Sequence, residues 1–271
     1  MMGPMERRIR CGGKPMTVIV LAGGLGRRMN ADKARLPVPG GTLLGRVLGQ
    51  VGPLFDEVLV SVSPGQNVDL GAAQVTNTPP SRRSGVVRAA SGGKAEKENR
   101  FQSKIIRDEL PGLGPMAGIL ACLKAAANDA CAVVACDIPD IDAPLLRELA
   151  RAAAEAEIAV PITPKGNFEP LFAVYRKAVI PEIEELLRTG ERSLLPLFGR
   201  CRTAVLRLED ASWLRNLNTR EDYESYILSL AAGKMASAGT PKSKGQFSTG
   251  GTARPQGRRP NDQRPGRVRR P

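Results

Sequence analysis

Short apolar runs alternate with longer amphipathic segments over residues 16–231 of this chain. Apolar runs of four to eight residues are typical of buried strands, whereas longer segments with apolar residues at helical spacing predict helices. The predicted strands are 16–21, 57–62, 104–107, 131–135, 157–160, 170–175 and 203–207. The predicted helices are about 42–51, 115–127, 142–154, 178–189, 193–199 and 219–231.

This alternation predicts an α/β fold, a Rossmann-like, mostly parallel sheet flanked by helices on both faces. Ligands of open α/β sheets bind beyond the carboxyl ends of the strands. We therefore expect the functional residues in the turns that follow the strands.

Three segments lack the pattern: two of them flank a single domain over 16–231, and the third interrupts it. Residues 72–103 are rich in Pro, Ser, Gly and Lys/Arg without an apolar face, which predicts a disordered insertion. Residues 232–271 repeat Gly, Pro and Arg and predict a disordered basic tail. Residues 1–15 carry charge but no apolar run, which predicts a flexible extension and not a secretory signal.

Charge and hydropathy exclude two classes of partner. The formal net charge is +13, but ten Lys/Arg against one Asp in 232–271 and four against one Glu in 1–15 leave the body near neutral. A basic tail on a near-neutral domain predicts no specific nucleic-acid surface. No apolar run approaches the length of a membrane span.

Histidine is absent and the chain has five cysteines. The absence of histidine excludes Ser-His-Asp and Cys-His catalysis and His-ligated zinc, so a metal here would be a hard ion held by oxygens, which favours Mg²⁺. The cysteine spacings contain no CxxC and no plausible disulfide framework, which favours reduced thiols and a cytoplasmic location.

The loop after the first predicted strand is rich in glycine and in positive charge. Glycine lets backbone N–H groups approach a phosphate closely, and nearby cations neutralise it. The residues concerned are Gly23, Gly24, Gly26, Arg27, Arg28 and Lys33. A tight strand-to-helix turn with solvated charges is the alternative. Met29 replaces the third glycine of the dinucleotide fingerprint, and no Gly-Lys-Ser/Thr follows as in a Walker loop.

Acidic residues end two further predicted strands. Asp137 follows the strand 131–135 and is a natural Mg²⁺ ligand, because it faces the same crevice as the glycine loop. The alternative role of helix cap suits Asp142 better, since Pro144 follows it near the helix start. Asp108 follows the strand 104–107 and precedes a Gly/Pro loop that opens into a helix, which by itself is also an ordinary connection.

The motif LAGG-x-G-x-R-M…D-K…L-P-V, together with Cys136-Asp137-Ile138-Pro139, resembles the signature of the MobA-like nucleotidyltransferases. Within that family, the run 29–33 most resembles the molybdenum cofactor guanylyltransferases. Asn30 stands where the family usually has glycine, a change that Asn tolerates because it enters left-handed conformations readily. The resemblance covers about residues 16–229 without the insertion.

The resemblance implies roles for individual residues. Those implied in nucleotide binding are Leu21, Ala22, Gly23, Gly24, Gly26, Arg27, Lys33, Ser63 and Asp108. Those implied in catalysis are Lys33, Arg28 and Asp137, with Asp137 also the metal ligand. Those implied in acceptor binding are Arg192, Asn216 and Asn218. Ser63 stands where the family often has Asn, which leaves the choice of nucleobase open. The turn 216–223 also reads as a simple helix start, with Thr219 or Asn218 as its N-cap.

The implied reaction is transfer of GMP from GTP to the phosphate of molybdopterin, with release of pyrophosphate. The mechanism would be a direct in-line attack assisted by Mg²⁺, in which positioning and charge neutralisation dominate. The implied partners are GTP, a molybdopterin-type cofactor and a molybdoenzyme or its chaperone. Alternatives are cytidylyl transfer to molybdopterin, guanylyl transfer to a corrinoid phosphate, sugar-phosphate activation, or a non-catalytic nucleotide- or cofactor-delivery module.

Overall fold

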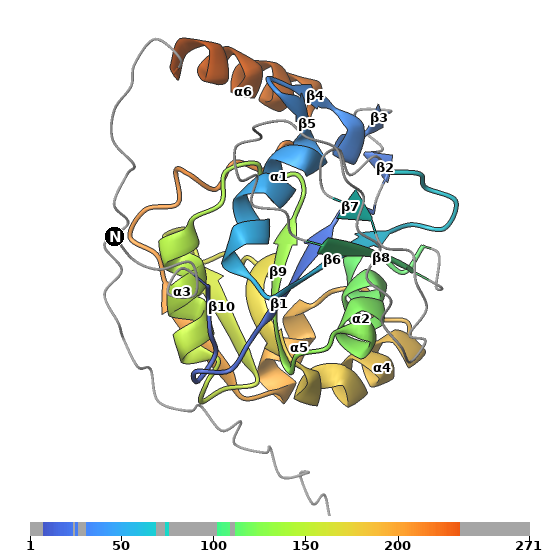
Figure 1. The fold of residues 1–271 in the computed structure, drawn as a ribbon. Helices are drawn as coiled ribbons and strands as arrows, with labels where there is room; N and C mark the ends of the chain where they lie inside the picture. The colour runs from blue at the N-terminus through green and yellow to red at the C-terminus, as the bar shows by residue number, and fades with distance from the viewer. Residues whose placement is uncertain are drawn as a thin grey trace, which may run out of the picture.

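An eight-stranded sheet forms the centre of the molecule in the computed structural model (Figure 1). The structure describes residues 8–23, 25–26, 31–68, 74–75, 102–108 and 112–233. The strand order is β12-β10-β11-β9-β1-β6-β8-β7, and β11 alone in this sheet runs antiparallel to its neighbours. The fold class predicted from the sequence, a mostly parallel sheet with helices on both faces, is confirmed.

The elements lie close to their predicted positions. The strands of the sheet are β1 (Thr17–Leu21), β6 (Glu57–Val62), β7 (Gln74–Val75), β8 (Gln102–Arg107), β9 (Ala130–Ala135), β10 (Ile158–Ile162), β11 (Phe172–Arg176) and β12 (Thr203–Arg207). The α-helices are α1 (Leu43–Val51), α2 (Pro115–Ala125), α3 (Ala143–Ala152), α4 (Ile180–Arg188), α5 (Leu195–Arg200) and α6 (Arg220–Gly233). Short 3-10 turns occupy η1 (Lys33–Arg35), η2 (Gly52–Leu54) and η3 (Lys177–Val179).

Strand β1 is buried along its whole length and apolar after Thr17, because both faces of the sheet are covered. Val18 and Val20 point into the core under α1 and α3, whereas Ile19 and Leu21 point into the core under α2, α4 and α5. Successive side chains of a strand alternate between faces, so one five-residue run supplies both cores. The chain leaves β1 at the edge of the sheet where the parallel strands have their carboxyl ends.

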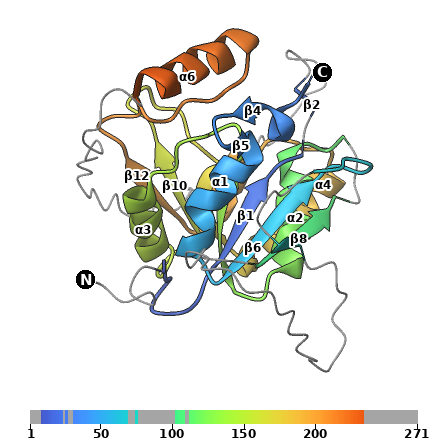
Figure 2. The same cartoon turned by 45° about the horizontal axis from the view of Figure 1, so that its top comes forward.

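Helix α6 lies beyond that edge, against the hairpin of β4 (Pro37–Val38) and β5 (Gly41–Thr42) (Figures 1 and 2). A third apolar cluster joins them, built on the buried side chains Val38, Leu43, Leu217 and Tyr226. The C-terminal helix is thereby fixed over the segment that follows β1. A second small hairpin, β2 (Leu25–Gly26) with β3 (Ala31–Asp32), lies in the same segment.

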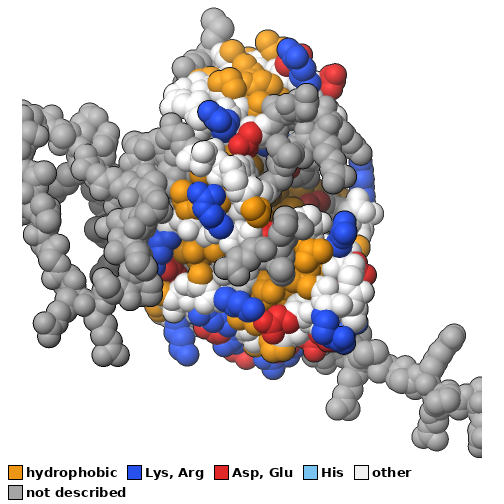
Figure 3. All heavy atoms as spheres, turned by 90° about the vertical axis from the view of Figure 1, so that its right-hand side faces the viewer, with side chains coloured by type: hydrophobic (Ala, Val, Ile, Leu, Met, Phe, Trp, Pro, Cys, Tyr) orange, Lys and Arg blue, Asp and Glu red, His pale blue; other side chains and the backbone are white. Residues whose placement is uncertain are grey.

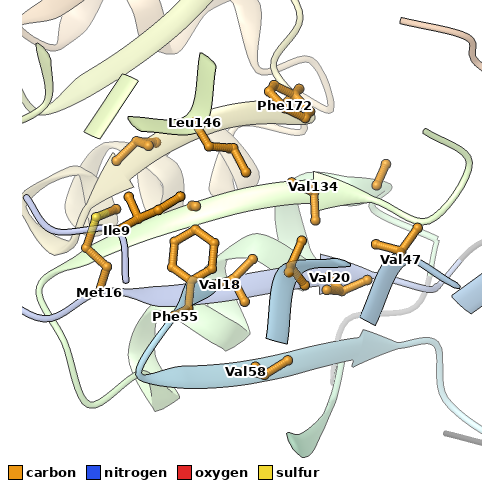
Figure 4. Packing of buried hydrophobic residues seen from close by; sticks show 14 of the residues in the cluster. Ile9, Met16, Val18, Val20, Val47, Phe55, Val58, Val134, Leu146 and Phe172 are labelled. Carbon is orange, nitrogen blue, oxygen red and sulfur yellow. The ribbon is translucent and has the colours of Figure 1, made fainter. Parts of the chain in front are cut away.

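Residues 8–14 pack on the domain, so the expectation that residues 1–15 form a flexible extension is wrong over this stretch. The Ile9 side chain is 1% exposed and points into the core beside Met16 and Phe55 (Figure 4). The Ile9 N–H donates to the Leu54 carbonyl at 2.7 Å, and Arg8 pairs with Asp56 at 2.8 Å. One isolated isoleucine gives no periodicity, which is why the sequence pattern missed this segment.

The boundaries predicted for the insertion and for the C-terminal tail also differ from those in the structure. Gln74–Val75 pairs with β8, and β8 begins at Gln102, so ordered strand reaches into both ends of the predicted 72–103 insertion. Residues 76–101 lie outside the described residues. Helix α6 continues to Gly233, two residues into the predicted tail, and residues 234–271 lie outside the described residues.

Positive and negative side chains are interspersed on the face shown in Figure 3, where Lys and Arg lie singly among acidic and apolar groups. None of the helices in the described part of the chain combines the length and apolarity needed to cross a bilayer.

Candidate active site

The Lys33 ammonium lies where three distant segments of the chain meet. Its Nζ donates to Asp137 Oδ2 at 2.9 Å and to Asn218 Oδ1 at 2.8 Å. The Lys33 and Asp137 side chains are only 15% and 21% exposed, so this ion pair is partly shielded from solvent. The sequence predicted roles for all three residues, and the fold brings them together.

Lys33 owes its position to a local turn. Asp32 is extended and caps η1, because its Oδ1 accepts a hydrogen bond from the Ala34 N–H at 3.1 Å. The capped turn begins with Lys33 itself. When the residue before a tight turn has a short polar side chain, its oxygen can accept a hydrogen bond from an N–H of the turn that has no other partner. This bond fixes the backbone direction of the following residue.

Asp137 is fixed from both sides by backbone hydrogen bonds. The preceding Cys136 N–H donates to the Leu21 carbonyl at 3.0 Å, which ties the end of β9 to the end of β1. The Asp137 carbonyl accepts from the Leu217 N–H at 2.9 Å, which ties the same turn to the segment before α6. Asp142 caps α3, accepting from the Leu145 N–H, so the alternative cap role for Asp137 is excluded.

The turn before α6 orients Asn218. Asp222 Oδ2 accepts from the Asn218 and Thr219 N–H groups at 3.1 and 2.8 Å, and Thr219 Oγ1 accepts from the Asp222 N–H at 3.1 Å. This reciprocal pair is a capping box, and it confirms Thr219 as the predicted N-cap. Hydrogen bonds from Thr219, aided by the nearby positive charge of Lys33, lower the pKa of Asp222.

The glycine loop begins in close contact with the end of β6. The Ala22 N–H donates to the Ser61 carbonyl at 2.9 Å. A Cβ added at Gly23 would lie 3.0 Å from Ser63 Oγ and 3.1 Å from the Ser63 nitrogen, so glycine permits an approach that a side chain would crowd. The sequence predicted Gly23 and Ser63 as nucleotide-binding residues, and they face each other.

Several predicted residues are described only in part. Leu25–Gly26 is described as the short strand paired with Ala31–Asp32. The predicted phosphate-binding residues Gly24, Arg27 and Arg28 lie outside the described residues, as do Met29 and Asn30.

Asp108 lies at the same edge of the sheet as Ser63. Its backbone N–H donates to the Val62 carbonyl at 3.0 Å, immediately after β8. The ends of β6 and β8 are adjacent in the sheet, which places Asp108 next to the segment that carries Ser63.

The predicted acceptor residues do not form one cluster. Asn216 is exposed, and its carbonyl accepts from the Asn218 N–H at 2.9 Å, so it belongs to the turn that carries Asn218. Arg192 is exposed in the turn between α4 and α5, where its N–H donates to Glu191. Within the described part of the chain, no hydrogen bond or ion pair joins Arg192 to Lys33 or Asp137.

Two polar residues at this edge were missed by the sequence reasoning. Gln66 donates to the Ala22 carbonyl and to both carboxylate oxygens of Asp32. The D-K pair of the motif contains Asp32 and could have drawn attention to it. Gln66 carries no comparable signal, because a lone Gln in a loop has no spacing pattern.

The donor chemistry of Asp137 fits Mg²⁺. Its carboxylate is partly exposed and already attracts one cationic group, the Lys33 ammonium. Among the residues that the structure describes, no cluster of three His, Cys, Asp or Glu side chains forms a metal cage. Mg²⁺ is commonly held by one or two carboxylates together with substrate phosphates, so a single carboxylate suffices on the protein side.

Comparison with known proteins decides the family. Residues 18–204 match the model of the MobA-like NTP transferase domain. The chain belongs to this family. This MobA-like protein is therefore a nucleotidyltransferase by family, and the resemblance drawn from its motifs is confirmed.

Curated relatives match most of the chain. A protein of Mycobacterium marinum is 32% identical over 209 residues, covering 75% of this chain and 89% of the relative. A protein of Carboxydothermus hydrogenoformans is 26% identical over 219 residues, covering 78% and 95%. Each carries the name "Probable molybdenum cofactor guanylyltransferase".

Solved structures share the fold at low identity. Molybdopterin-guanine dinucleotide biosynthesis protein A from Archaeoglobus fulgidus has a TM-score of 0.58 and 22% identity, covering 80% of this chain and 100% of its own. The 2-C-methyl-D-erythritol 4-phosphate cytidylyltransferase from Thermus thermophilus has a TM-score of 0.52 and 19% identity, covering 80% and 98%. The same fold thus occurs in proteins named for different nucleotides, so the fold alone does not select the base.

Proposed function

We propose that this MobA-like protein transfers GMP from GTP to the phosphate of molybdopterin and releases pyrophosphate. The observation that carries the proposal is the meeting of Lys33, Asp137 and Asn218 at the carboxyl edge of the sheet. Lys33 and Asp137 come from the two motifs that carry the resemblance, and Asn218 comes from the turn 216–223 in which the resemblance implies acceptor binding. The names of the relatives from Mycobacterium marinum and Carboxydothermus hydrogenoformans support the choice of guanine and of the molybdenum cofactor.

In this reaction the protein has to bind the two substrates and neutralise the charge on their phosphates. An oxygen of the acceptor phosphate attacks the α-phosphorus of GTP, the bond from that phosphorus to the bridging oxygen of the β-phosphate breaks, and pyrophosphate leaves. The glycine loop would offer backbone N–H groups to the triphosphate, and Lys33 would neutralise its developing charge. No protein nucleophile is needed, which suits a chain without histidine.

Arg27 or Arg28 would stabilise the leaving pyrophosphate, and Ser63 and Asp108 would contact the nucleoside. The backbone of Leu21 and Ala22 would lie against the base. Asn216 and Asn218 would face the acceptor, with Arg192 as a further phosphate contact.

Asp137 would hold the catalytic Mg²⁺. When bound, the ion would withdraw electron density from the phosphate oxygens and so ease attack at phosphorus. In the absence of substrate, Lys33 neutralises the Asp137 carboxylate. The cytoplasm suits this proposal, because the five cysteines are free and four of them are buried.

Pyrophosphate release from GTP, CTP and ATP, each with and without molybdopterin and with and without Mg²⁺, tests the proposal. We expect release from GTP only when molybdopterin and Mg²⁺ are both present. Asp137→Asn should abolish this release while leaving the thermal unfolding midpoint within a few degrees.

Other outcomes would correct the proposal. Selective release from CTP would overturn the base assignment and keep the class of reaction. Release from GTP only with a corrinoid or sugar phosphate would overturn the acceptor. Nucleotide binding without release in any combination would favour a non-catalytic delivery module.

A further inference from the structure

Gln66 lies in the loop after β6 and contacts the ends of three adjacent parallel strands. Its side-chain Nε2 donates to the Ala22 carbonyl after β1 at 2.9 Å. Its Oε1 accepts from the Ser63 N–H after β6 at 3.1 Å, and its own carbonyl accepts from Arg107 at the end of β8, also at 3.1 Å. A single residue therefore ties β1, β6 and β8 together at the edge that carries the candidate site.

The same amide also holds Asp32. Gln66 Nε2 lies 2.9 Å from Asp32 Oδ1 and 3.0 Å from Oδ2, so its second N–H is shared by both carboxylate oxygens. Asp32 Oδ1 in turn caps the turn that begins with Lys33. The hydrogen bonds run from Ala22, through Gln66 and Asp32, to the Ala34 N–H in the turn that begins with Lys33.

Only a primary amide in one orientation satisfies these partners. Two acceptors, the Ala22 carbonyl and the Asp32 carboxylate, face the NH₂ group, and one donor, the Ser63 N–H, faces the oxygen. A carboxylate at position 66 would place negative oxygen against two acceptors. A side chain one methylene shorter would not span the Ala22, Ser63 and Asp32 groups together.

We propose that Gln66 is a positioning residue of the nucleotide site, which holds Ala22, after β1, in register with the Lys33 turn. The inference rests on the proposed nucleotidyl transfer for its kinetic consequence only. The hydrogen bond from Gln66 also holds the Asp32 carboxylate in its capping position. Lys33 therefore pairs with Asp137 and Asn218 and not with Asp32. Correct placement of phosphate-binding groups is a main source of rate in this class of reaction.

The test compares Gln66→Ala and the isosteric Gln66→Glu with Asn128→Ala as a matched control. Asn128 also uses a side-chain amide, donating to Thr17 Oγ1 at 3.1 Å, but at the opposite end of β1. Steady-state kinetics with GTP and molybdopterin would be measured for each full-length variant, with thermal unfolding midpoints and amide hydrogen exchange of residues 31–36 in the nucleotide-free protein.

We expect both Gln66 variants to raise the KM for GTP about tenfold and to lower kcat, as expected for loss of several partly buried hydrogen bonds at one residue. The KM for molybdopterin should stay within about twofold, and the unfolding midpoints should match that of Asn128→Ala. Exchange over residues 31–36 should accelerate in the Gln66 variants and not in the control. A merely structural role would lower the unfolding midpoint and leave the KM for GTP unchanged.

Kinetics and exchange separate this inference from the proposed function. Faster exchange over residues 31–36 in a protein that turns over no nucleotide would support the positioning role and overturn the proposed reaction. An active protein in which Gln66→Ala changes neither the KM for GTP nor the exchange rate would overturn the positioning role.

Discussion

The Lys33 ammonium is the residue on which the candidate site depends most directly. It is held between the Asp137 carboxylate and the Asn218 amide oxygen, and 15% of its side chain is exposed. In the proposed reaction, a cation so placed would need no further side-chain ordering when the phosphate arrives.

Lys33→Ala should lower kcat by a factor of about 10²–10³, the scale of losing one pre-organised electrostatic contact. It should also leave Asp137 without its cationic partner. Pyrophosphate release under saturating GTP measures the effect. Lys124→Ala is the control, because Lys124 forms only an exposed ion pair with Glu184. Full turnover by Lys33→Ala would remove Lys33 from the reaction.

At the scale of the element, the packing of α2 on β6 depends on a single missing methyl group. A Cβ on Gly118 would lie 2.4 Å from Ser61 Oγ, closer than real Cβ contacts allow. Ser61 is 4% exposed, so its hydroxyl has little room to move. Gly118 therefore lets the helix approach the sheet closely.

Gly118→Ala should destabilise the fold by about 1–3 kcal/mol through overpacking. In a Ser61→Ala background the same change should be neutral or stabilising, because the clash is gone and Ala favours helix over Gly by about 1 kcal/mol. Urea unfolding of the two single variants and the double variant measures the coupling. Additive effects would show that Ser61 does not cause the strain.

The first residue of β6, Glu57, is a titratable group at the edge of the sheet opposite the candidate site. Burial by itself raises the pKa of Glu57, but hydrogen bonds from the Ala127 N–H, Lys104 and Thr17 outweigh that effect and lower it below its usual value of 4.5. A carboxyl whose pKa is lower in the folded state stabilises the fold above the unfolded pKa, and this stabilisation is lost as pH falls through the folded pKa.

Glu57→Gln should therefore be less stable than the parent at neutral pH, and the difference should shrink as pH falls below 4.5. Unfolding midpoints in urea between pH 7 and about pH 3 measure this dependence. Glu184→Gln, which removes a carboxylate from an exposed surface ion pair, is the matched control. A constant difference at all pH values would mean that Glu57 does not contribute through its charge.

At the scale of the whole molecule, two segments outside the central alternation complete the fold. The N-terminal segment fills one core with Ile9, and α6 packs through Tyr226 on Val38 and Leu43, together with Leu217 from the turn that precedes the helix. Tyr226 also donates to Asp140 at 3.0 Å, and Arg46 pairs with Asp140 and lies over the Tyr226 ring. Both ends of the described chain thus contribute to the domain.

Ile9→Ala should destabilise the domain by about 2–5 kcal/mol, the usual cost of emptying a fully buried aliphatic site. Arg8→Ala, which removes only a partly exposed ion pair with Asp56, should cost no more than about 1 kcal/mol. Equilibrium unfolding in urea compares the two. If both substitutions lowered the free energy of unfolding by the same small amount, the expectation of a flexible extension would hold after all.

The apolar pattern predicted the sheet well because burial leaves a local signature. The run 57–62 and the run 203–207 were predicted with the boundaries that the structure has, since both are short apolar stretches between polar turns. The strand 104–107 was predicted two residues short at its start, because Gln102 and Ser103 are polar although Ser103 is fully buried.

The candidate site was predictable in its motifs and not in its connections. Glycines, a lysine and a strand-end aspartate are recognisable from residue type and neighbourhood alone. The hydrogen bonds through Gln66 and Asp32 were not predicted, because they join positions 22, 32, 63 and 66, whose closeness depends on which strands are neighbours in the sheet.

The sequence by itself determined the class of fold, the family and the residues that carry charge at the strand ends, because apolar periodicity and short motifs are local properties of the chain. The tertiary structure decided which of those residues meet. It set Lys33 against Asp137 and Asn218, left Arg192 in a separate turn, and placed Ile9 in the core. The physical reason is that such contacts depend on strand order and packing, which join residues more than a hundred positions apart and leave no trace in the local pattern.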